Sequence, residues 1–539
     1  MTDDVKIEQV NVNKKFSRRS ALKGIGGALA AATIPSVRAD GTSTSAEQHK
    51  PWSARTETAT IKKHAGKPNI LWITGEGVPV SALSCYGSTL IQTPNIDRIA
   101  NEGVRFRNAF TTNALCGPSR ATLLTGTYSH INGTIANPGI QVISGEAEPT
   151  FDESQPTVAK LLKQNGYQTG IVGKWHLPAN PGNVGFDYFV FKEGAGGPYY
   201  EAEGYLGNSK LGSNVIEKQR HEGYETDITT DLAIKGMKEF TQPFLMMVQY
   251  FNAHRPFDPP HKYEHLYDTE RIPEAGTFWD DYSHRASPAA AARMRIADMP
   301  DFSPPKDLTE RQRKQWNHQQ FMAHFLGTLR SQDDNIGRLL QFLEKSGLAD
   351  NTIVVYTCDH GFFLGDHGWF DKRFMYEQAL RVPLMVRSPG HIEAGVVRDE
   401  FAVNIDNAPT ILDLLGVEIP ARMQGRSLVP LLAGDKPKDW RTSIYYHYYE
   451  FGDPHWVEPH YGIRTDRYKL ISYYKINQWE LFDLEKDPDE MESLCIGGGY
   501  RIQPGYEAIA AGLVGQLREL RDHYGDHTGL PVVAMPVND

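Results

Sequence analysis

Four short runs rich in apolar and β-branched residues constrain the fold of this chain more than any other feature of its sequence. Runs of this length and composition are typical of strands that are buried on both faces of a mainly parallel sheet. Glu76 follows the first run, and Asp359 follows the last. The runs are residues 69–74, 169–172, 244–250 and 352–357.

Segments with helical periodicity alternate with these runs. Apolar side chains recur at helical spacing over residues 93–101, 157–165, 321–346 and 408–415. Alternation of buried strands with amphipathic helices predicts an α/β fold built on a large, doubly wound, mainly parallel sheet. Ligands bind such sheets beyond the carboxyl ends of the strands, so we expect the functional site there.

The pattern changes after about residue 434. Aromatic and β-branched residues then dominate four short segments that are typical of antiparallel strands, and residues 509–520 show one apolar helical face. We predict a larger α/β domain over residues 67–434 and a smaller C-terminal α+β domain over residues 435–539, formed by an antiparallel sheet and a helix. The four expected strands are residues 443–449, 461–464, 468–474 and 480–484.

The first 39 residues have the order of features of an export signal. Arg18 and Arg19 precede a weakly apolar, small-residue run over residues 24–37, and Ala39 closes a segment of the kind that signal peptidases cleave. Residues 1–39 therefore resemble a twin-arginine signal peptide, which implies the Tat translocon as a partner and an exported, periplasmic or secreted protein. The alternative is a basic tail before a short helix. Residues 40–66 are polar and are predicted to be a linker.

Charge and hydropathy argue against two other classes of protein. The net charge of -10 disfavours a nucleic-acid-binding protein, which needs a positive field. Outside the leader, no stretch approaches the roughly 18 apolar residues of a membrane span, so we expect none in the mature protein. Any anionic ligand must be held by a local cluster of positive groups.

Cys116 opens the most specific segment of the chain. Residues 116–126, Cys-Gly-Pro-Ser-Arg-Ala-Thr-Leu-Leu-Thr-Gly, resemble the signature C-x-P-S-R-x-x-x-L-T-G of the type I sulfatases, in the alkaline phosphatase superfamily. The resemblance implies that a formylglycine-generating enzyme oxidises Cys116 to formylglycine. One hydroxyl of the hydrated aldehyde would attack sulfur, and the other would expel sulfate as the aldehyde re-forms. Arg120, one turn into the following helix, would stabilise the oxyanion form.

Three further segments are similar to the same family in the family's chain order. The resemblance implies that Lys174 neutralises the reacting oxygens and binds the substrate, and that His176 is the base in sulfate release. It also implies that His254 and Lys372 bind the substrate and protonate or polarise its leaving oxygen. The similar segments are residues 173–177, 253–257 and 359–368, and the resemblance extends over about residues 67–494.

The resemblance further implies a divalent metal, held by Glu76, Asp359, His360 and the modified Cys116. Where the family places two aspartates after the first strand, this chain has Glu76 and Gly77, and glycine offers no ligand. Calcium is the preferred candidate, with water or the substrate sulfate completing its oxygen shell. The nitrogen ligand from His360 leaves manganese and zinc as alternatives.

These features predict a sulfatase that hydrolyses sulfate monoesters on a sulfated polysaccharide or oligosaccharide. The aromatic and histidine side chains of residues 445–461 offer His455 and His460 as contacts at the pocket rim, although aromatic runs also form strand core. Two alternatives stay open. One is a phosphonate monoester or phosphodiester hydrolase, because that related group pairs aspartate with histidine as in Asp359-His360. The other is a catalytically inactive sulfatase-like binding protein, because Gly77 removes a ligand.

Overall fold

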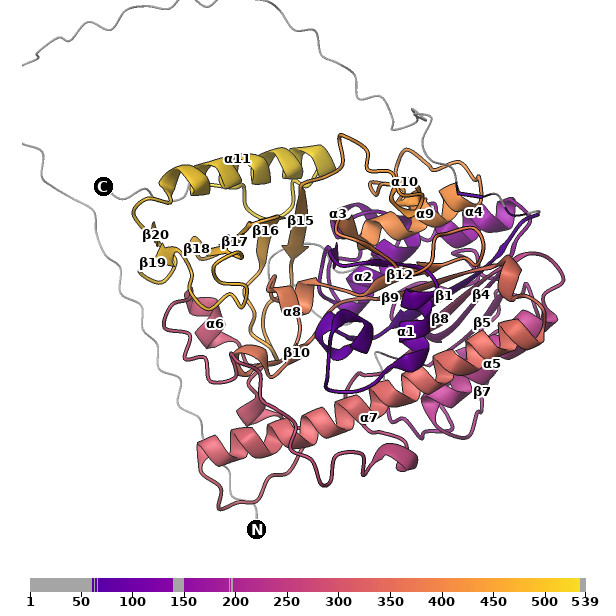
Figure 1. Cartoon of the computed structure of the whole chain (residues 1–539), viewed down its shortest axis with the longest axis horizontal. Helices are drawn as coiled ribbons and strands as arrows, with labels where there is room; N and C mark the ends of the chain where they lie inside the picture. The colour runs from indigo at the N-terminus through magenta and orange to yellow at the C-terminus, as the bar shows by residue number, and fades with distance from the viewer. Residues whose placement is uncertain are drawn as a thin grey trace, which may run out of the picture. The chain divides into compact units, whose positions relative to one another are not determined.

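Five parallel strands form the centre of a ten-stranded mixed sheet in the computed structural model (Figure 1). Their spatial order is β9, β1, β8, β4 and β5, which differs from their order in the chain, as a doubly wound fold requires. Four of them confirm the predicted apolar runs, with ends that agree within two residues. The five are β1 (Asn69–Gly75), β4 (Gln168–Lys174), β5 (Tyr188–Lys192), β8 (Phe244–Gln249) and β9 (Thr352–Cys358).

Shorter strands extend this sheet at both edges. Beyond β9, β12 is antiparallel to both of its neighbours, and β13 is parallel to β2. Beyond β5, β6 and β7 continue as antiparallel strands. The edge strands are β2 (Val104–Phe106), β6 (Tyr205–Gly207), β7 (Glu217–Gln219), β12 (Leu384–Arg387) and β13 (Val396–Arg398).

Helices cover both faces of the sheet, so the expected α/β architecture is confirmed (Figure 1). α7 packs with α1 and α5 on one face, and α2, α4 and α9 pack together on the other. α7 begins well before the predicted residue 321, because a capping box of Thr309 and Gln312 starts it with polar turns that lack an apolar period. The helices are α1 (Pro94–Asn101), α2 (Cys116–Thr125), α4 (Val158–Gln164), α5 (Glu225–Glu239), α7 (Glu310–Lys345) and α9 (Asn407–Leu414).

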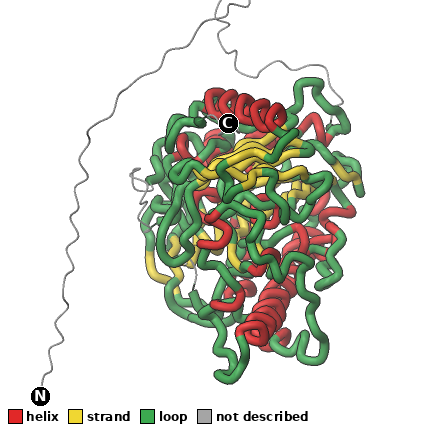
Figure 2. Tube along the Cα trace, turned by 90° about the vertical axis from the view of Figure 1, so that its left-hand side faces the viewer, coloured by secondary structure: helices red, strands yellow, loops and turns green. Residues whose placement is uncertain are grey.

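The C-terminal part forms a four-stranded antiparallel sheet in sequential order. α11 (Glu507–Tyr524) packs on it, and Figure 2 shows this helix as a layer over the strands. The predicted antiparallel sheet and its helix are thus confirmed. The strands are β15 (Ser443–Tyr448), β16 (His460–Thr465), β17 (Tyr468–Tyr473) and β18 (Gln478–Asp483).

The small sheet shares its core with segments of the larger predicted domain. One hydrophobic cluster surrounds the large sheet, whereas the second joins Phe110, Trp369 and Tyr376 to Tyr446 and Trp479 of the small sheet. The segment before Cys116 and the segment after Lys372 are therefore packed directly on the small sheet.

The structure describes residues 61–533 apart from residues 63, 65, 139–149, 193, 195 and 196. The predicted leader and most of the predicted linker lie outside the described residues. Among the described helices, none is both long and apolar enough to cross a membrane.

The remaining α-helices and strands of the described residues are short. They are α3 (Ser129–Asn132), α6 (Ser287–Ala291), α8 (Glu377–Leu380), α10 (Val429–Leu432), β3 (Ala109–Phe110), β10 (Phe363–Leu364), β11 (Phe370–Asp371), β14 (Ala402–Val403), β19 (Cys495–Ile496) and β20 (Arg501–Ile502).

Candidate active site

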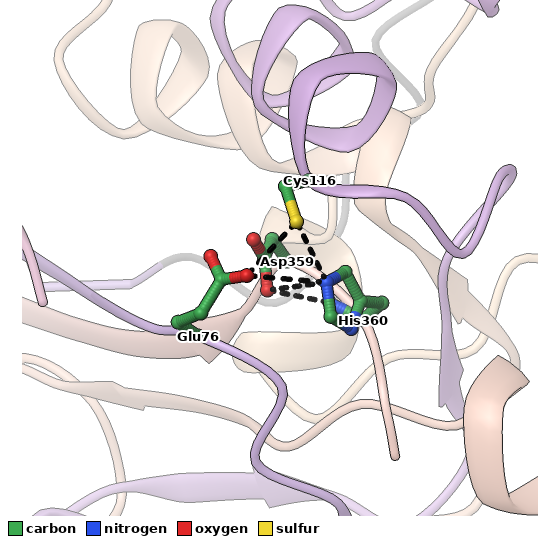
Figure 3. Close-up of side chains that lie close together, drawn as sticks. All are labelled: Glu76, Cys116, Asp359 and His360. Atoms are coloured by element: carbon green, nitrogen blue, oxygen red, sulfur yellow. Dashed lines mark hydrogen bonds and ion pairs between the residues drawn. The ribbon is translucent and has the colours of Figure 1, made fainter. Parts of the chain in front are cut away.

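Four side chains from three separate segments meet in one buried cluster beyond the carboxyl ends of β1 and β9 (Figure 3). Glu76 follows β1, whereas Asp359 and His360 follow β9. Cys116 is the first residue of α2. Because β1 and β9 are parallel neighbours, the residues that follow both strands must lie side by side.

The ligand-type atoms of this cluster lie within 4.8 Å of one another. Cys116 Sγ lies 2.9 Å from Glu76 Oε1 and 3.5 Å from His360 Nε2. His360 Nδ1 donates to the carbonyl oxygen of Gly361 at 2.8 Å, which orients the ring with Nε2 toward the cluster. Carboxylate, sulfur and imidazole atoms are thus directed at a common centre.

Asp359 shows why the cluster fits a cation. Its Oδ1 accepts hydrogen bonds from the backbone N–H groups of Gly77 at 3.1 Å and His360 at 2.9 Å. Its Oδ2 makes no hydrogen bond to any described residue and lies 3.2 Å from Arg120 Nη2. Burial, with the nearby Glu76 charge, raises the pKa of Asp359 to about 7. A divalent cation would relieve this penalty on the charged carboxylate, so the donor set fits a metal ion.

Two buried cations, Arg120 and Lys174, flank the cluster. Arg120 Nη2 lies 2.7 Å from Glu76 Oε2, and Lys174 Nζ lies 2.9 Å from Glu76 Oε1. Arg120 Nη1 donates to the carbonyl oxygen of Lys174 at 3.0 Å and to Gln249 Oε1 at 2.7 Å. Burial alone would raise the pKa of Glu76, but Lys174, together with His360 and Arg120, holds it well below its ordinary value.

Cys116 lies in the field of these cations and of Lys372, which follows β11. Burial and the Glu76 charge would raise the pKa of the Cys116 thiol, but Lys174 and Lys372 outweigh both and hold that pKa well below its ordinary value. Position 116 is therefore an environment that stabilises negative charge, as the reacting atom of an anionic substrate site requires.

Two half-buried histidines, His176 and His254, complete the ring of side chains around Cys116. Burial lowers the pKa of both histidines, and the pKa of His254 falls to about 4. A hydrogen bond from each histidine to Cys116 acts in the opposite direction but does not outweigh burial. His254 Nδ1 donates to the carbonyl oxygen of Arg255 at 2.9 Å. Both histidines are neutral near pH 7 and able to accept a proton.

A second group of side chains borders Lys372, and the sequence analysis missed most of it. Asp371 Oδ1 lies 3.2 Å from Lys372 Nζ and 2.7 Å from Arg373 Nη1, and its Oδ2 lies 2.9 Å from His455 Nε2. Arg373, His455 and Glu450 line a small cavity. Asp371 and Arg373 are the sequence neighbours of Lys372, which the sequence analysis did predict as a site residue. That adjacency is the feature of the sequence from which they could have been predicted.

His460 does not lie at the pocket rim, which corrects that expectation. It is 0% exposed, and its ring packs among the aromatic side chains of Tyr446, Phe374 and Tyr473. Its Nδ1 donates to the carbonyl oxygen of Glu458, and its Nε2 accepts from a backbone N–H. The pleat of β16 turns this side chain inward, where no substrate can reach it. His455, in the loop before β16, does line the cavity.

The chain matches two protein-family models. The model described as Sulfatase matches residues 68–417, and the model described as N-sulphoglucosamine sulphohydrolase, C-terminal, matches residues 365–523. Together they cover the large sheet, the cluster around Cys116 and the small C-terminal sheet.

Curated relatives and solved structures agree with these models. An N-acetylglucosamine-6-O-sulfatase of Bacteroides thetaiotaomicron is 40% identical over 485 residues, which span 80% of this chain and 83% of the relative. An arylsulfatase of Clostridium perfringens is 28% identical over 82% of this chain and 92% of its own. A solved structure in complex with its substrate, D-glucosamine-2-N,6-O-disulfate, is 38% identical, with a TM-score of 0.77 over 86% of this chain and 99% of the other. The chain belongs to the sulfatase family of the alkaline phosphatase superfamily, and it is a sulfatase.

Proposed function

We propose that this sulfatase removes an O-sulfate from a sulfated glucosamine residue of a glycan, with Cys116 converted to formylglycine. The observation that carries the proposal is the position of Cys116, which is buried within a ring of two lysines, an arginine and two neutral histidines. The sugar is suggested by the 40% identical N-acetylglucosamine-6-O-sulfatase and by the 38% identical protein bound to a glucosamine disulfate.

Formylglycine, once formed and hydrated, supplies the hydroxyl that attacks sulfur and the second hydroxyl whose collapse releases sulfate. Arg120 and Lys174 hold the positive charge that keeps an oxyanion at position 116 stable. His176 is the base that takes the proton during sulfate release. His254 and Lys372 lie on the substrate side. The Lys372 ammonium group polarises the leaving oxygen by donating to it, and His254, which is neutral at rest, protonates that oxygen only after its Nε2 has taken up a proton from solvent.

Glu76, Asp359, His360 and the modified residue 116 would hold a divalent metal, with calcium preferred because three of these four donors are oxygen once Cys116 is modified. A bound metal would supply Lewis-acid charge on the sulfate oxygens. This requirement is tested by chelation. We expect sulfate release to fall in the chelated protein and to return with added calcium, and Asp359→Ala to lack both activity and metal in elemental analysis.

The cavity beside Lys372 would receive the sugar. Arg373 contributes donors, Glu450 contributes acceptors, and His455, whose Nε2 contacts Asp371, adds its imidazole ring, a mixture that suits the hydroxyl groups of a sugar ring. Contacts of this type would hold the sugar next to the loop that carries Lys372. The leaving oxygen of the ester would then face the Lys372 ammonium group.

The leading test is sulfate release from N-acetylglucosamine 6-sulfate by protein that is co-produced with a formylglycine-generating enzyme. We expect turnover, and an aldehyde at position 116 in the mass spectrum of the corresponding peptide. Cys116→Ser should lose multiple turnover, because serine lacks the second hydroxyl. Full activity of protein with an unmodified thiol would contradict the proposal.

A phosphodiester substrate distinguishes sulfatase activity from the alternative phosphonate or phosphodiester hydrolase activity. The pair Asp359-His360 is the reason to test that alternative. We expect a chromogenic sulfate ester to be cleaved much faster than the matching phosphodiester. The reverse preference would favour the phosphonate or phosphodiester reaction, and no turnover of either ester by metal-loaded, aldehyde-containing protein would favour a binding protein.

We also propose export through the Tat translocon, supported by Arg18, Arg19 and the small-residue run that follows them. Replacement of both arginines by lysine should leave modified, active enzyme in the cytoplasm. Unchanged export of that variant, measured by cell fractionation, would rule out the twin-arginine route.

A further inference from the structure

The loop that carries Lys372 has an unusual backbone. Asp371 and Arg373, on either side of Lys372, both have left-handed φ values, 79° and 96°. Non-glycine residues rarely adopt this conformation, and they keep it only where the surrounding structure holds it in place. The contacts that hold this loop therefore decide where the Lys372 ammonium group lies.

One hydroxyl joins this loop to the segment that precedes Cys116. Tyr446 of β15 donates from its hydroxyl to the carbonyl oxygen of Arg373 at 2.5 Å. The same hydroxyl accepts from the backbone N–H of Ala114 at 3.1 Å. Tyr446 is 0% exposed, so both hydrogen bonds are shielded from water. Arg373 directly follows Lys372, and Ala114 lies two residues before Cys116.

Other contacts place the same two segments on the small sheet. The backbone N–H of His447 donates to the carbonyl oxygen of Thr112 at 3.0 Å, which fixes β15 against the segment before Cys116. The backbone N–H of Met375 donates to His460 Nε2 at 3.2 Å. A Cβ atom at Gly462 would lie 2.5 Å from Met375 Sδ, so the loop rests directly on β16.

We propose that Tyr446 is a positioning residue that sets the distance between Lys372 and residue 116. The inference rests on the proposed function, in which Lys372 acts at the leaving oxygen of the ester. Removal of the hydroxyl frees the Arg373 carbonyl and the Ala114 N–H, and the left-handed loop then loses the contact that ties it to the Cys116 segment. Lys372 would be displaced from the leaving oxygen, while the nucleophile and the metal ligands keep their own supports.

The test compares Tyr446→Phe with the parent enzyme on two esters. A sugar 6-sulfate has a poor leaving group that needs help from Lys372, whereas 4-nitrophenyl sulfate has a good leaving group that needs little. We expect kcat to fall about tenfold or more on the sugar sulfate, since small misplacements of catalytic groups have effects of this size, and to change little on the aryl ester. Equal losses on both esters would overturn the inference.

Tyr445→Phe is the matched control. Tyr445 is the preceding residue of β15 and is equally buried, but its hydroxyl donates to Asp526 Oδ2 at 2.6 Å, on the opposite face of the strand. Its loss removes a buried hydrogen bond from the same strand without touching the loop. We expect the ratio of the two kcat values to stay as in the parent enzyme.

Hydrogen–deuterium exchange gives a readout that does not depend on turnover. Peptides that cover residues 111–116 and 371–377 should both exchange faster in Tyr446→Phe and not in Tyr445→Phe, and unchanged exchange would overturn the inference by itself. If the parent enzyme releases no sulfate from either ester, the proposed function fails, and the exchange experiment still decides whether Tyr446 holds the loop.

Discussion

At the scale of single residues, the backbone conformation of Gly77 determines whether a further carboxylate ligand can be added to the candidate metal site. Its φ is +60°, a conformation that side-chain-bearing residues rarely adopt. A Cβ atom there would lie 2.9 Å from Phe362 Cδ2 and 3.3 Å from His360 Cε1. From the sequence alone, an aspartate at position 77 would restore the missing metal ligand. The positive φ and the close contacts at this position disfavour any side chain there.

We therefore predict that Gly77→Asp lowers the free energy of unfolding by about 1–3 kcal/mol and does not tighten calcium binding. Chemical denaturation and calorimetric titration measure the two effects. Gly87→Asp is the control, because Gly87 also has a positive φ, +99°, but has no atom within 4 Å of its Cβ position. Tighter calcium binding by Gly77→Asp at unchanged stability would contradict this account.

A second residue-scale prediction concerns acid stability. His318 of α7 is 0% exposed, and burial lowers its pKa to about 4. Its pKa in the unfolded chain is about 6.5, so the unfolded state binds the proton first as the pH falls. The contribution of His318 is fully present above about pH 6.5 and is lost as the pH falls toward 4.

Between pH 7.5 and pH 4, we expect the parent protein to lose about 3 kcal/mol more stability than His318→Gln, which has no ionisable group at this position. Urea denaturation at the two pH values provides the measurement. Parallel pH profiles for the two proteins would show that His318 does not contribute.

At the scale of elements, the start of α1 depends on a side chain of α7. Asp333 Oδ1 accepts from the backbone N–H groups of Asn95 at 3.0 Å and Ile96 at 2.9 Å, and its Oδ2 accepts from Asn95 Nδ2. The residue before the helix, Thr93, makes no side-chain cap. Asp333 therefore satisfies N–H groups that the helix itself leaves without partners, and it joins two helices on one face of the sheet.

We predict that Asp333→Ala lowers the free energy of unfolding by about 2–4 kcal/mol, because two buried N–H groups lose their acceptor. Asp333→Asn retains the acceptor oxygen and should cost much less. Denaturation of both variants tests this, and an equal loss for alanine and asparagine would mean that the carboxylate charge, not the hydrogen bonds, is the important factor.

At the scale of the whole molecule, the small C-terminal sheet is part of the support of the active site. The second hydrophobic cluster joins side chains of the small sheet, such as Trp479, to side chains of segments within the larger predicted domain, such as Trp369. The match to the second family model begins at residue 365, before the loop with Lys372. A cut at the predicted domain boundary would therefore divide a shared core.

We predict that a chain ending at Gly434 fails to accumulate as soluble, folded protein, because it exposes the apolar side chains that face the small sheet. A chain ending at residue 533 is the control and should behave like the full-length protein. Expression with light scattering and circular dichroism distinguishes them. A monomeric, cooperatively folding protein of residues 1–434 would contradict the shared core.

Much of the fold and most of the cluster around Cys116 could be predicted from the amino-acid pattern alone. Buried strands and amphipathic helices have local signatures, and Glu76 and Asp359 had to become neighbours once both followed parallel central strands. The segment that begins at Cys116 carries its signature within eleven consecutive residues. These features do not depend on the details of packing.

Tertiary packing alone decided the rest. His455 and His460 are five residues apart in one aromatic run, yet one lines the cavity and the other is core, because strand register and the path of a loop set which way each side chain points. The contact of Tyr446 with Ala114 and Arg373 joins residues more than seventy positions apart. No local propensity encodes such contacts, since they exist only when the small sheet docks on the segments that surround the active site.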